Sequence, residues 1–375
     1  RFLTAISSAG VNVEVIAQGS TECAIAVVVR GEDAQPATRA CHTAFFSLSS
    51  HIDVILMGCG NVGGELLDQV QRQAASLQEH HVDLRVRAIA NSTRLLVADD
   101  VIDLSNWREE MEQNGTEWTL DDIIAIRTRL GLLSPTIVDC STDEGLAAQY
   151  VRLLDSGFNI VAAHKKANTM DQAYYRELRA AESRNFRKFL YETNVAAGLP
   201  FIDTLQSLIR SGDELRTFEG ILSGSLSMIF GLLEDGIPIS QAVAKAMELG
   251  YTEPDPRDDL SGMDVARKLL IIAREVGLRL ELKDIEVEPV VPWDVVGHVD
   301  RADLIETLKT LDESLSERIA AAARSDAVLR YVARLEDGKC RVAIEAVERS
   351  KPLGAIRDGE NALVIHTAYY QPIPM

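Results

Sequence analysis

Residues 53–63 read Asp53-Val54-Ile55-Leu56-Met57-Gly58-Cys59-Gly60-Asn61-Val62-Gly63. The apolar run at 54–57 predicts a short buried strand, and the apolar spacing of residues 66–70 predicts an amphipathic helix after it. Glycines spaced Gly-x-Gly-x-x-Gly allow a tight turn and let the backbone approach a pyrophosphate at the helix N-terminus. Alone, this spacing also fits a plain turn. Its place between a strand and a helix favours dinucleotide binding by Gly58, Gly60, Asn61, Val62 and Gly63.

Three more strand patterns follow, at 84–90, 136–140 and 159–163. Helical patterns separate them, and one of these helices should end at Gly157, because glycine tolerates the left-handed backbone found there. Alternating strands and helices predict an α/β fold with a Rossmann-like, doubly wound parallel sheet.

The strand pattern at 84–90 is followed by Asn91-Ser92-Thr93-Arg94. A strict NAD site would place an acidic residue near this point to bind the ribose hydroxyl. Here the residues are small and polar, and Arg94 could receive a 2′-phosphate. We therefore expect Asn91 and Arg94 to contact a cofactor that is NADP(H) rather than NAD(H), and use of both stays open.

The sequence on either side of this region has different strand and helix patterns. Two β-rich runs, at 11–16 and 24–29, flank the turn-prone residues 18–21. Beyond residue 200, long helical patterns are followed by strands at 328–335 and 341–347, which Asp337-Gly338 should join as a hairpin. We expect an appendage at 1–50, a nucleotide-binding domain at 51–200 and an α+β domain at 201–375.

Composition narrows the class of protein. The chain has 375 residues, 46% of them hydrophobic, and a formal net charge of -19. This charge repels phosphate backbones and anionic lipid, and no clustered basic patch opposes it. No apolar run approaches the length that spans a bilayer, and no leader pattern opens the chain. From composition we expect a soluble, cytoplasmic protein without nucleic-acid or membrane partners; a small-molecule substrate is expected only from the motifs below.

The five cysteines are far apart and form no metal-ligand spacing. Together with the absence of HExxH, they give metal catalysis no support. Cys140 follows an apolar run, and a packing role at a strand end is the favoured interpretation. A phosphorylating semialdehyde dehydrogenase, which needs a catalytic Cys beside a His, therefore ranks last among the candidate functions.

Residues 246–268 hold the densest group of chemically active side chains. A helix should end at Gly250, an acidic loop with two prolines should follow, and a second helix should begin near Gly262. Asp264 and Lys268 are four residues apart and share one face of that helix. For an arbitrary pair with this spacing, a weak surface ion pair is the ordinary interpretation.

The whole segment closely resembles the homoserine dehydrogenase family. The resemblance implies that Glu253 binds the substrate's amino group, that Asp264 assists, and that Lys268 gives and takes the proton; Gly250 and Asp259 belong to the same substrate-binding loop. Lysine suits this role because desolvation can bring an ammonium pKa toward neutrality.

Three further segments resemble the same family. At 138–142 the resemblance implies cofactor contacts from Ser141 and Thr142, and at 163–168 it implies that Lys165 lies near the nicotinamide and acts in catalysis. Without the resemblance, Lys165 and its neighbour would be interpreted as a solvated pair. The loop at 192–200 resembles the family's monovalent-cation loop, which implies sodium coordination, largely through main-chain carbonyls, by Glu192, Val195, Ala197 and Leu199.

The sequence also departs from the family pattern. Ala162-Ala163-His164 replaces the usual Thr-Pro-Asn, and Ala196 replaces a usual Gly. The N-terminal stretch through Gln18-Gly19-Ser20 resembles the end of an ACT regulatory region, which favours an aspartokinase-fused member of the family. The chain stops at Met375, where the family continues, so part of the cofactor site is expected to be missing.

Two hypotheses follow from these residues. The first is an NAD(P)-dependent dehydrogenase that interconverts aspartate semialdehyde and homoserine. For this enzyme the family resemblance implies a homodimer, built through the second domain, or a larger homo-oligomer. The alternative is a catalytically impaired regulatory or assembly module of the fusion, suggested by the ACT remnant and the altered segments. Oxidation of NADPH on addition of aspartate semialdehyde would separate them.

Overall fold

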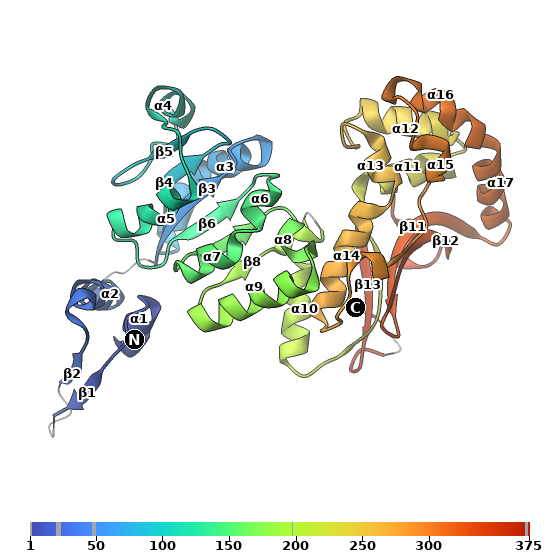
Figure 1. Cartoon of the computed structure of the whole chain (residues 1–375). Helices are drawn as coiled ribbons and strands as arrows, with labels where there is room; N and C mark the ends of the chain where they lie inside the picture. Colours follow the sequence, from blue (N-terminus) through green and yellow to red (C-terminus); the bar gives the residue numbers. More distant parts are fainter. Residues whose placement is uncertain (1, 20–23, 47–49, 197, 372–373) are drawn as a thin grey trace. The chain divides into compact units, whose positions relative to one another are not determined.

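The computed structural model describes residues 2–19, 24–46, 50–196, 198–371 and 374–375. The chain forms two compact units (Figure 1). The first comprises Arg1–Ala167 and Ala173–Tyr191, and the second comprises Asn168–Gln172 and Glu192–Met375. The polypeptide therefore enters the second unit for five residues, returns to the first, and leaves it again after Tyr191.

The first unit alternates strands and helices along the chain. Its elements are α1 (Phe2–Ser8), β1 (Val15–Gln18), β2 (Ile25–Val28), α2 (Ala34–Phe46), β3 (Ser50–Met57), α3 (Asn61–Glu79), β4 (Val82–Ala90), β5 (Leu95–Val97), α4 (Trp107–Asn114), α5 (Leu120–Arg129), β6 (Thr136–Asp139), α6 (Glu144–Ala147), α7 (Tyr150–Asp155), β7 (Asn159–Ala162), α8 (Lys166–Thr169), α9 (Gln172–Asn185) and β8 (Phe189–Leu190). The strand patterns predicted at 54–57, 84–90, 136–140 and 159–163 correspond to β3, β4, β6 and β7.

Six strands form one sheet in the order β5-β4-β3-β6-β7-β8. All neighbouring pairs are parallel except β4 with β5, which is an antiparallel edge that the sequence did not reveal. The chain goes from β3 to β4 on one side and then returns to β6 on the other. The carboxyl ends of β3 and β6 therefore flank a switch point, the place where α/β sheets of this kind bind ligands.

Helices cover both faces of this sheet. Leu56 and Val138 pack with residues of α3 and α4 in one apolar cluster. Asp139, the next residue of β6, accepts a hydrogen bond from Tyr150 of α7. Because successive strand residues point to opposite faces, α3 and α7 lie on opposite sides. The predicted doubly wound α/β fold is confirmed.

The N-terminal segment adds a small two-stranded antiparallel sheet beside α1 and α2. The first strand begins only at Val15, so the β-run expected at 11–16 overlaps it in part. Val11 is instead buried in an apolar cluster with residues of α1 and α2. Its apolar side chain therefore reflects packing against helices and does not indicate a strand. Residues 20 and 21 of the expected turn lie outside the described residues.

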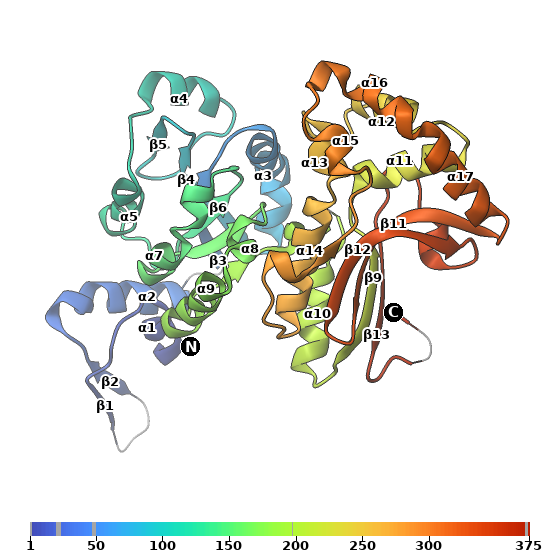
Figure 2. The same cartoon turned by 45° about the vertical axis from the view of Figure 1, so that its right-hand side comes forward.

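The second unit combines helices with one sheet (Figure 2). Its elements are α10 (Phe201–Arg210), β9 (Leu215–Ile221), α11 (Gly224–Glu234), α12 (Ile239–Glu248), α13 (Pro256–Leu260), α14 (Met263–Glu275), β10 (Glu286–Val287), α15 (Trp293–Val296), α16 (Leu304–Leu308), α17 (Asp312–Ala323), β11 (Ala327–Glu336), β12 (Lys339–Glu348) and β13 (Ala362–Thr367), with short 3-10 turns between them. The strand order is β10-β12-β11-β9-β13, antiparallel except for β10 with β12.

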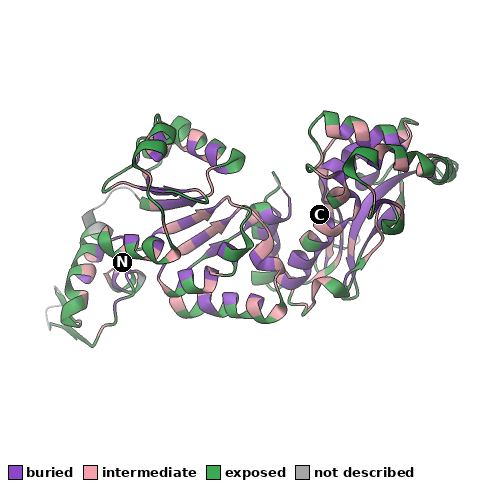
Figure 3. Cartoon of the chain, turned by 45° about the horizontal axis from the view of Figure 1, so that its top comes forward, coloured by how far each residue is buried: buried purple, intermediate pink, exposed green. Residues whose placement is uncertain are grey.

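The predicted hairpin joins β11 to β12. Glu336 pairs with Lys339, which leaves Asp337 and Gly338 as a two-residue loop. Both have positive φ, 49° and 73°, the combination of the turn that matches the natural strand twist. Helices α11, α14 and α17 pack on β11, which is buried along nearly its whole length (Figure 3).

The short segment Asn168–Gln172 is fixed within the second unit by Arg274 of α14. The Arg274 Nη1 group donates to the carbonyl oxygens of Asn168 at 2.8 Å and Met170 at 2.7 Å. The amide of Gln172 donates to Glu281 Oε1 at 2.8 Å. The Arg274 side chain is 0% exposed, so these carbonyls replace the water that the guanidinium gives up.

Among the described residues, no helix combines the length and apolar character that a bilayer crossing requires.

Candidate active site

The turn after β3 depends on two of its glycines for steric reasons. Gly58 has φ +88°, and a Cβ there would lie 2.6 Å from the Ser141 amide nitrogen. A Cβ on Gly63 would lie 2.0 Å from the Gly58 carbonyl oxygen, so its absence lets α3 approach the turn closely. A Cβ on Gly60 would meet nothing within 4 Å. Gly60 therefore leaves open space, where the rule for dinucleotide sites places a pyrophosphate.

Helix α3 begins directly after this turn, with Gly60 as its N-cap residue. No side chain caps this helix end. The helix has 19 residues, and its first amides and positive dipole end are suited to an anionic group. Asn61, Val62 and Gly63 supply the first turn, at the carboxyl edge of the sheet.

Asn91 organises the turn that follows β4. Its Oδ1 accepts hydrogen bonds from the amides of Thr93 at 2.9 Å and Arg94 at 2.7 Å. Arg94 Nη1 donates to the carbonyls of Met111 and Glu112 at the end of α4. The structure thus places both predicted residues in one turn at the carboxyl edge. One nitrogen of the Arg94 guanidinium is already hydrogen-bonded to α4.

The end of β6 carries a buried carboxylate, Asp139, which is 0% exposed. Its Oδ1 accepts from the Ser141 amide at 2.8 Å, and its Oδ2 lies 2.6 Å from the Tyr150 hydroxyl and 3.0 Å from His164 Nε2. Burial alone would raise the pKa of Asp139. The donors from His164, Tyr150 and Ser141 outweigh it, so the pKa of Asp139 lies below its ordinary value.

The remaining predicted residues of this edge lie in the turns that follow β6 and β7. Ser141 Oγ accepts from the Asp143 amide at 3.2 Å, which shapes the turn containing Thr142. Lys165 is half-buried, and its neighbour Lys166 has its Nζ 3.6 Å from Glu144 Oε2. Neither lysine is therefore the fully solvated residue that the local sequence alone suggested.

Cys140 is a packing residue, as predicted from its position at a strand end. It contacts the apolar cluster of Leu56 and Val138. Burial and the neighbouring Asp139 carboxylate raise the pKa of the Cys140 thiol to about 11. A thiol in this environment is a poor nucleophile, which argues against thiol catalysis at this position.

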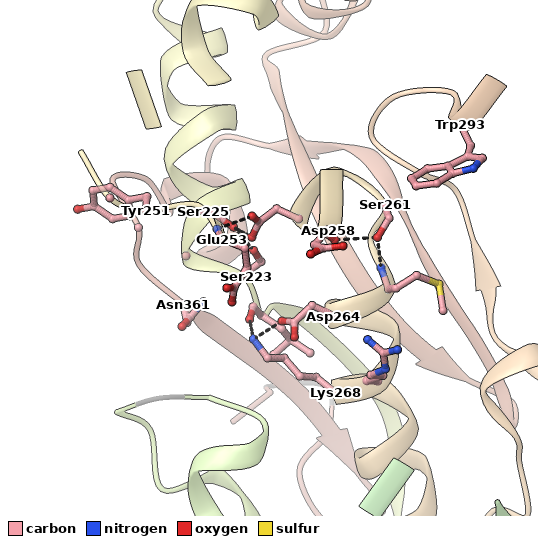
Figure 4. A pocket seen from close by; sticks show the side chains of 17 residues that line it. Ser223, Ser225, Tyr251, Glu253, Asp258, Ser261, Asp264, Lys268, Trp293 and Asn361 are labelled. Atoms are coloured by element: carbon pink, nitrogen blue, oxygen red, sulfur yellow. Dashed lines mark hydrogen bonds and ion pairs between the residues drawn. The ribbon is translucent and has the colours of Figure 1, made fainter. Parts of the chain in front are cut away.

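The second unit contains a pocket of about 890 Å³, which we call the α14 pocket (Figure 4). Five predicted residues line it together: Gly250, Glu253, Asp259, Asp264 and Lys268. It is also lined by residues that the sequence did not single out, of which Ser223, Ser225, Tyr251, Asp258, Ser261, Arg267, Trp293 and Asn361 carry polar or aromatic side chains.

Two local features shape the acidic loop of this pocket. Gly250 follows α12 with φ +73°, a left-handed conformation that glycine adopts without strain. The expected irregular loop contains a single helical turn, α13, which the sequence prediction missed. Asp255 caps it by accepting from the Arg257 amide at 3.1 Å, and Pro256 is its first residue. An Asp-Pro pair is a recognised start signal, so this helix could have been predicted.

Asp259 joins the acidic loop to α11. It accepts from Ser225 Oγ at 2.6 Å and from the Glu253 amide at 2.9 Å, which fixes the backbone of Glu253 at the pocket. Burial raises the pKa of Asp259, and the nearby carboxylates of Asp264 and Asp258 add to this effect against the two hydrogen bonds.

Lys268 is held by two oxygen atoms. Its Nζ lies 2.9 Å from Asp264 Oδ2 and 2.7 Å from the carbonyl oxygen of Leu222. Figure 4 shows the side chain reaching from α14 toward Asp264 in the pocket. The expectation that both side chains share one helix face is confirmed, and the pair is not a solvated surface ion pair.

The predicted cation loop lies elsewhere in the second unit. Both carboxylate oxygens of Glu192 cap α10, accepting from the amides of Ile202 at 2.7 Å and Asp203 at 2.9 Å. Val195 is buried and Leu199 is exposed, while Ala197 lies outside the described residues. Within the described part of the chain, no cluster of three or more His, Cys, Asp or Glu side chains could hold a metal ion.

The missed pocket residues had weak sequence signals. Ser223 and Ser225 occur in a run of small residues before an apolar helix, which reads as a capping sequence; Ser223 indeed accepts from the Leu226 amide at 3.2 Å. Asn361 and Trp293 are more than 20 residues away from the acidic loop along the chain. Only the fold brings them to the pocket.

Three family models match the chain. The model described as "Homoserine dehydrogenase" matches residues 200–375, and "Homoserine dehydrogenase, NAD binding domain" matches 58–192. An ACT domain model matches 1–45. The two homoserine dehydrogenase models thus cover both the glycine turn and the α14 pocket.

Individual proteins are similar along most of the chain. A bifunctional aspartokinase/homoserine dehydrogenase of Haemophilus influenzae is 48% identical over 376 residues, which covers 100% of this chain and 46% of the relative. The chain therefore spans about half the length of the curated relatives that it matches.

Solved structures share the fold. A Candida auris protein of unknown function has a TM-score of 0.80 and 29% identity, over 87% of this chain and 92% of its own. A hyperthermophilic archaeal homoserine dehydrogenase in complex with NADPH has a TM-score of 0.64 and 20% identity, over 87% and 90% of the two chains. From the family models and the relatives, we conclude that the chain belongs to the homoserine dehydrogenase family of NAD(P)-dependent oxidoreductases.

Proposed function

We propose that this chain is the homoserine dehydrogenase part of a bifunctional aspartokinase/homoserine dehydrogenase. It interconverts L-aspartate 4-semialdehyde and L-homoserine in the aspartate-derived biosynthesis of threonine and methionine. The observation that carries the proposal is the placement of the Lys268 ammonium group between Asp264 and the Leu222 carbonyl, in a pocket shared with Glu253.

The cofactor proposal rests on the first unit. The space left open at Gly60 and the uncapped N-terminus of α3 fit a dinucleotide. A bound nicotinamide supplies hydride in one direction and accepts it in the other. Gly58, Gly60, Asn61, Val62 and Gly63 would hold the pyrophosphate, with Ser141, Thr142 and Lys165 nearer the nicotinamide. Asn91 and Arg94, in place of an acidic residue, favour NADP(H), and NAD(H) use stays open.

The chain's own residues would move the proton. In the reducing direction, Lys268 donates a proton to the carbonyl oxygen of the semialdehyde as it becomes a hydroxyl, and in the oxidising direction it takes the proton back. Asp264 assists by holding the ammonium group in place. Glu253 binds the substrate's own ammonium group, and its position follows from the hydrogen bond between its amide and Asp259.

The substrate also carries a carboxylate, which needs a cation in the pocket. Arg267 lines the pocket and is exposed. It forms no hydrogen bond or ion pair with any other residue that the structure describes, whereas Lys268 is already held by two oxygens. We therefore assign Arg267 as the partner of the substrate carboxylate, because a guanidinium can donate two parallel hydrogen bonds to it.

A sodium site at 192–199 is a proposal from the family resemblance. Because the Glu192 carboxylate is committed to two amides of α10, the ligands would be main-chain carbonyls of Glu192, Val195, Ala197 and Leu199. Carbonyl oxygens suit a hard monovalent cation. Activity measured against added sodium, with choline chloride at equal ionic strength, tests the site.

The domain division at 1–50, 51–200 and 201–375 is likewise proposed, with an ACT remnant and linker, a cofactor domain, and a catalytic and dimerisation domain. The matches at 1–45, 58–192 and 200–375 support it. A cytoplasmic location and a homodimer or larger homo-oligomer complete the proposal, and light scattering of the purified protein tests the oligomeric state.

The deciding experiment measures oxidation of NADPH, and separately of NADH, when aspartate semialdehyde is added to the purified protein. We expect turnover that requires Lys268. If neither cofactor is oxidised by wild-type protein that is folded and stable, the dehydrogenase proposal fails and the impaired regulatory module takes its place.

A further inference from the structure

The carboxyl edge of the first unit contains a buried side-chain network that the reaction scheme does not use. Asp139 is at its centre and is inaccessible to solvent. One carboxylate oxygen accepts from the amide of Ser141, and the other from the Tyr150 hydroxyl and His164 Nε2. One carboxylate therefore joins the turn after β6 to the turn after β7.

His164 carries this connection into the turn that holds Lys165. The Lys166 amide lies 3.3 Å from His164 Nδ1. An amide can only donate, so Nδ1 accepts and the ring proton belongs on Nε2, where it is donated to Asp139. The ring also stacks on Tyr150, with centroids 6.4 Å apart, and its side chain is 13% exposed. Both ring nitrogens are thus committed to fixed partners.

We propose that Asp139 and His164 are positioning residues that hold the Ser141–Thr142 turn and the Lys165–Lys166 turn in a single geometry for the cofactor. This inference rests on the proposed dehydrogenase function. The two residues touch neither the substrate nor the reacting atoms; they act through Ser141, Thr142 and Lys165. Tyr150 supplies the third donor to the buried carboxylate and limits rotation of the imidazole.

The chemistry of the network predicts which replacement preserves it. The imidazole offers an acceptor toward the Lys166 amide and a donor toward Asp139. An asparagine amide offers the same pair of groups on one planar unit, and its oxygen commonly accepts from the amide two residues later. Alanine offers neither group and leaves the Asp139 carboxylate without one of its donors, at a cost that is larger because the site is buried.

The test compares His164→Ala with His164→Asn. For His164→Ala we expect the dissociation constant of NADPH to rise about tenfold and kcat to fall by about 10- to 100-fold, since small misplacements of positioned groups are costly. The KM for homoserine should stay within about twofold, because the α14 pocket is in the other unit. His164→Asn should restore both values to within about threefold of wild type.

A second His–Asp pair provides a matched control. His51 Nδ1 lies 2.8 Å from Asp83 Oδ2 at the opposite, amino-terminal end of β3 and β4. His51→Ala removes a comparable contact in the same sheet and should leave NADPH affinity unchanged. Hydrogen exchange of the peptide covering 159–170 gives a readout without any ligand. Exchange there should be faster in His164→Ala and close to wild type in His164→Asn.

The outcomes separate the two proposals. NADPH affinity and exchange that are unchanged in His164→Ala overturn the positioning role, as does an equal loss in His164→Asn or in His51→Ala. If the wild-type protein neither binds NADPH nor turns over homoserine, the proposed function fails. The exchange experiment still decides whether His164 holds the turn.

Discussion

The Lys268 ammonium nitrogen lies 2.9 Å from Asp264 Oδ2, one helical turn earlier on α14, and 17% of the lysine side chain is exposed. The carbonyl of Leu222, which follows β9 and also lines the pocket, provides a second oxygen at 2.7 Å. A side chain held from two elements has one preferred position. Such preorganisation is what a proton-transfer group needs, and it is unnecessary for a surface ion pair.

Removing this amine should abolish most turnover. We expect Lys268→Ala to lower kcat by about 100-fold or more, because a positioned general acid or base contributes on that scale. NADPH affinity should be unchanged. Steady-state kinetics and a cofactor titration check both statements. The control is Lys245→Ala, at an exposed lysine of α12. Near-normal kcat in Lys268→Ala would return Asp264 and Lys268 to a structural role.

Glu253 should affect substrate binding rather than the chemical step. Glu253→Gln keeps the shape and the backbone hydrogen bond to Asp259 but removes the charge that is proposed to bind the substrate's ammonium group. We expect KM for homoserine to rise about tenfold or more, with kcat changed little, because the contact is equally strong in ground and transition states. Glu248→Gln, an exposed residue of α12, is the control. A fall in kcat at constant KM would contradict this assignment.

Arg267, the proposed partner of the substrate carboxylate, should also affect substrate binding rather than the chemical step. Arg267→Gln is expected to raise KM for homoserine about tenfold, the scale of one charge-assisted hydrogen-bonded pair, and Arg267→Lys should recover part of the loss. The amino alcohol that lacks the carboxylate separates this role from a general effect. Its KM should be equally poor with wild type and variant, and a further rise in the variant would contradict carboxylate binding.

Replacing Gly58 and replacing Gly60, two glycines of the same turn, should have different effects: the first on stability, the second on NADPH binding. Gly58→Ala places a Cβ 2.6 Å from the Ser141 amide at φ +88° and should cost about 2 kcal/mol or more of stability. Gly60→Ala meets nothing within 4 Å in the protein and should leave the melting temperature unchanged. It should still weaken NADPH binding, because its methyl group occupies the space assigned to the pyrophosphate. Thermal melting and NADPH titration on both variants distinguish the two; equal melting temperatures would contradict the steric account.

The lowered pKa of Asp139 predicts a pH-dependent stability. Because the native carboxyl binds its proton less tightly than the unfolded one, its ionised form adds stability above the ordinary aspartate pKa of about 4. That contribution is lost as pH falls through the lowered native pKa. The difference in unfolding free energy between wild type and Asp139→Asn should therefore widen from acidic pH to roughly pH 5 and then stay constant. Urea unfolding at several pH values measures it, and a pH-independent difference would contradict the direction of the pKa shift.

Much of this architecture follows from local sequence patterns. The run at 54–57 became β3 because apolar residues bounded by glycine form a buried strand, and Asp337-Gly338 formed its hairpin because both residues accept positive φ. Lys268 and Asp264 met because helical spacing brings residues four apart together. These relationships depend on neighbours in the chain.

What escaped prediction depends on residues that are distant in sequence. The hydrogen bond from Ser225 to Asp259 spans 34 residues, and that from Lys268 to Leu222 spans 46. The His164–Asp139 contact arises because β6 and β7 are adjacent and parallel, which no spacing rule reveals. His164 therefore looked like a disruptive replacement, although its two ring nitrogens satisfy the local donors and acceptors.

The five-residue excursion at Asn168–Gln172 has a consequence for how such proteins can be cut and recombined. A fragment ending at Tyr191 would carry the Asn168 and Met170 carbonyls but not Arg274. In the complementary fragment, the buried Arg274 guanidinium would keep the Leu280 carbonyl and Glu281 but lose these two acceptors. Gene fusion or shuffling at the junction near residue 191 would thus separate Arg274 from the two carbonyls that it holds. Chimaeras that exchange the cofactor-binding half must keep the partners of this segment together, by transplanting residues 168–172 with the half that contains Arg274.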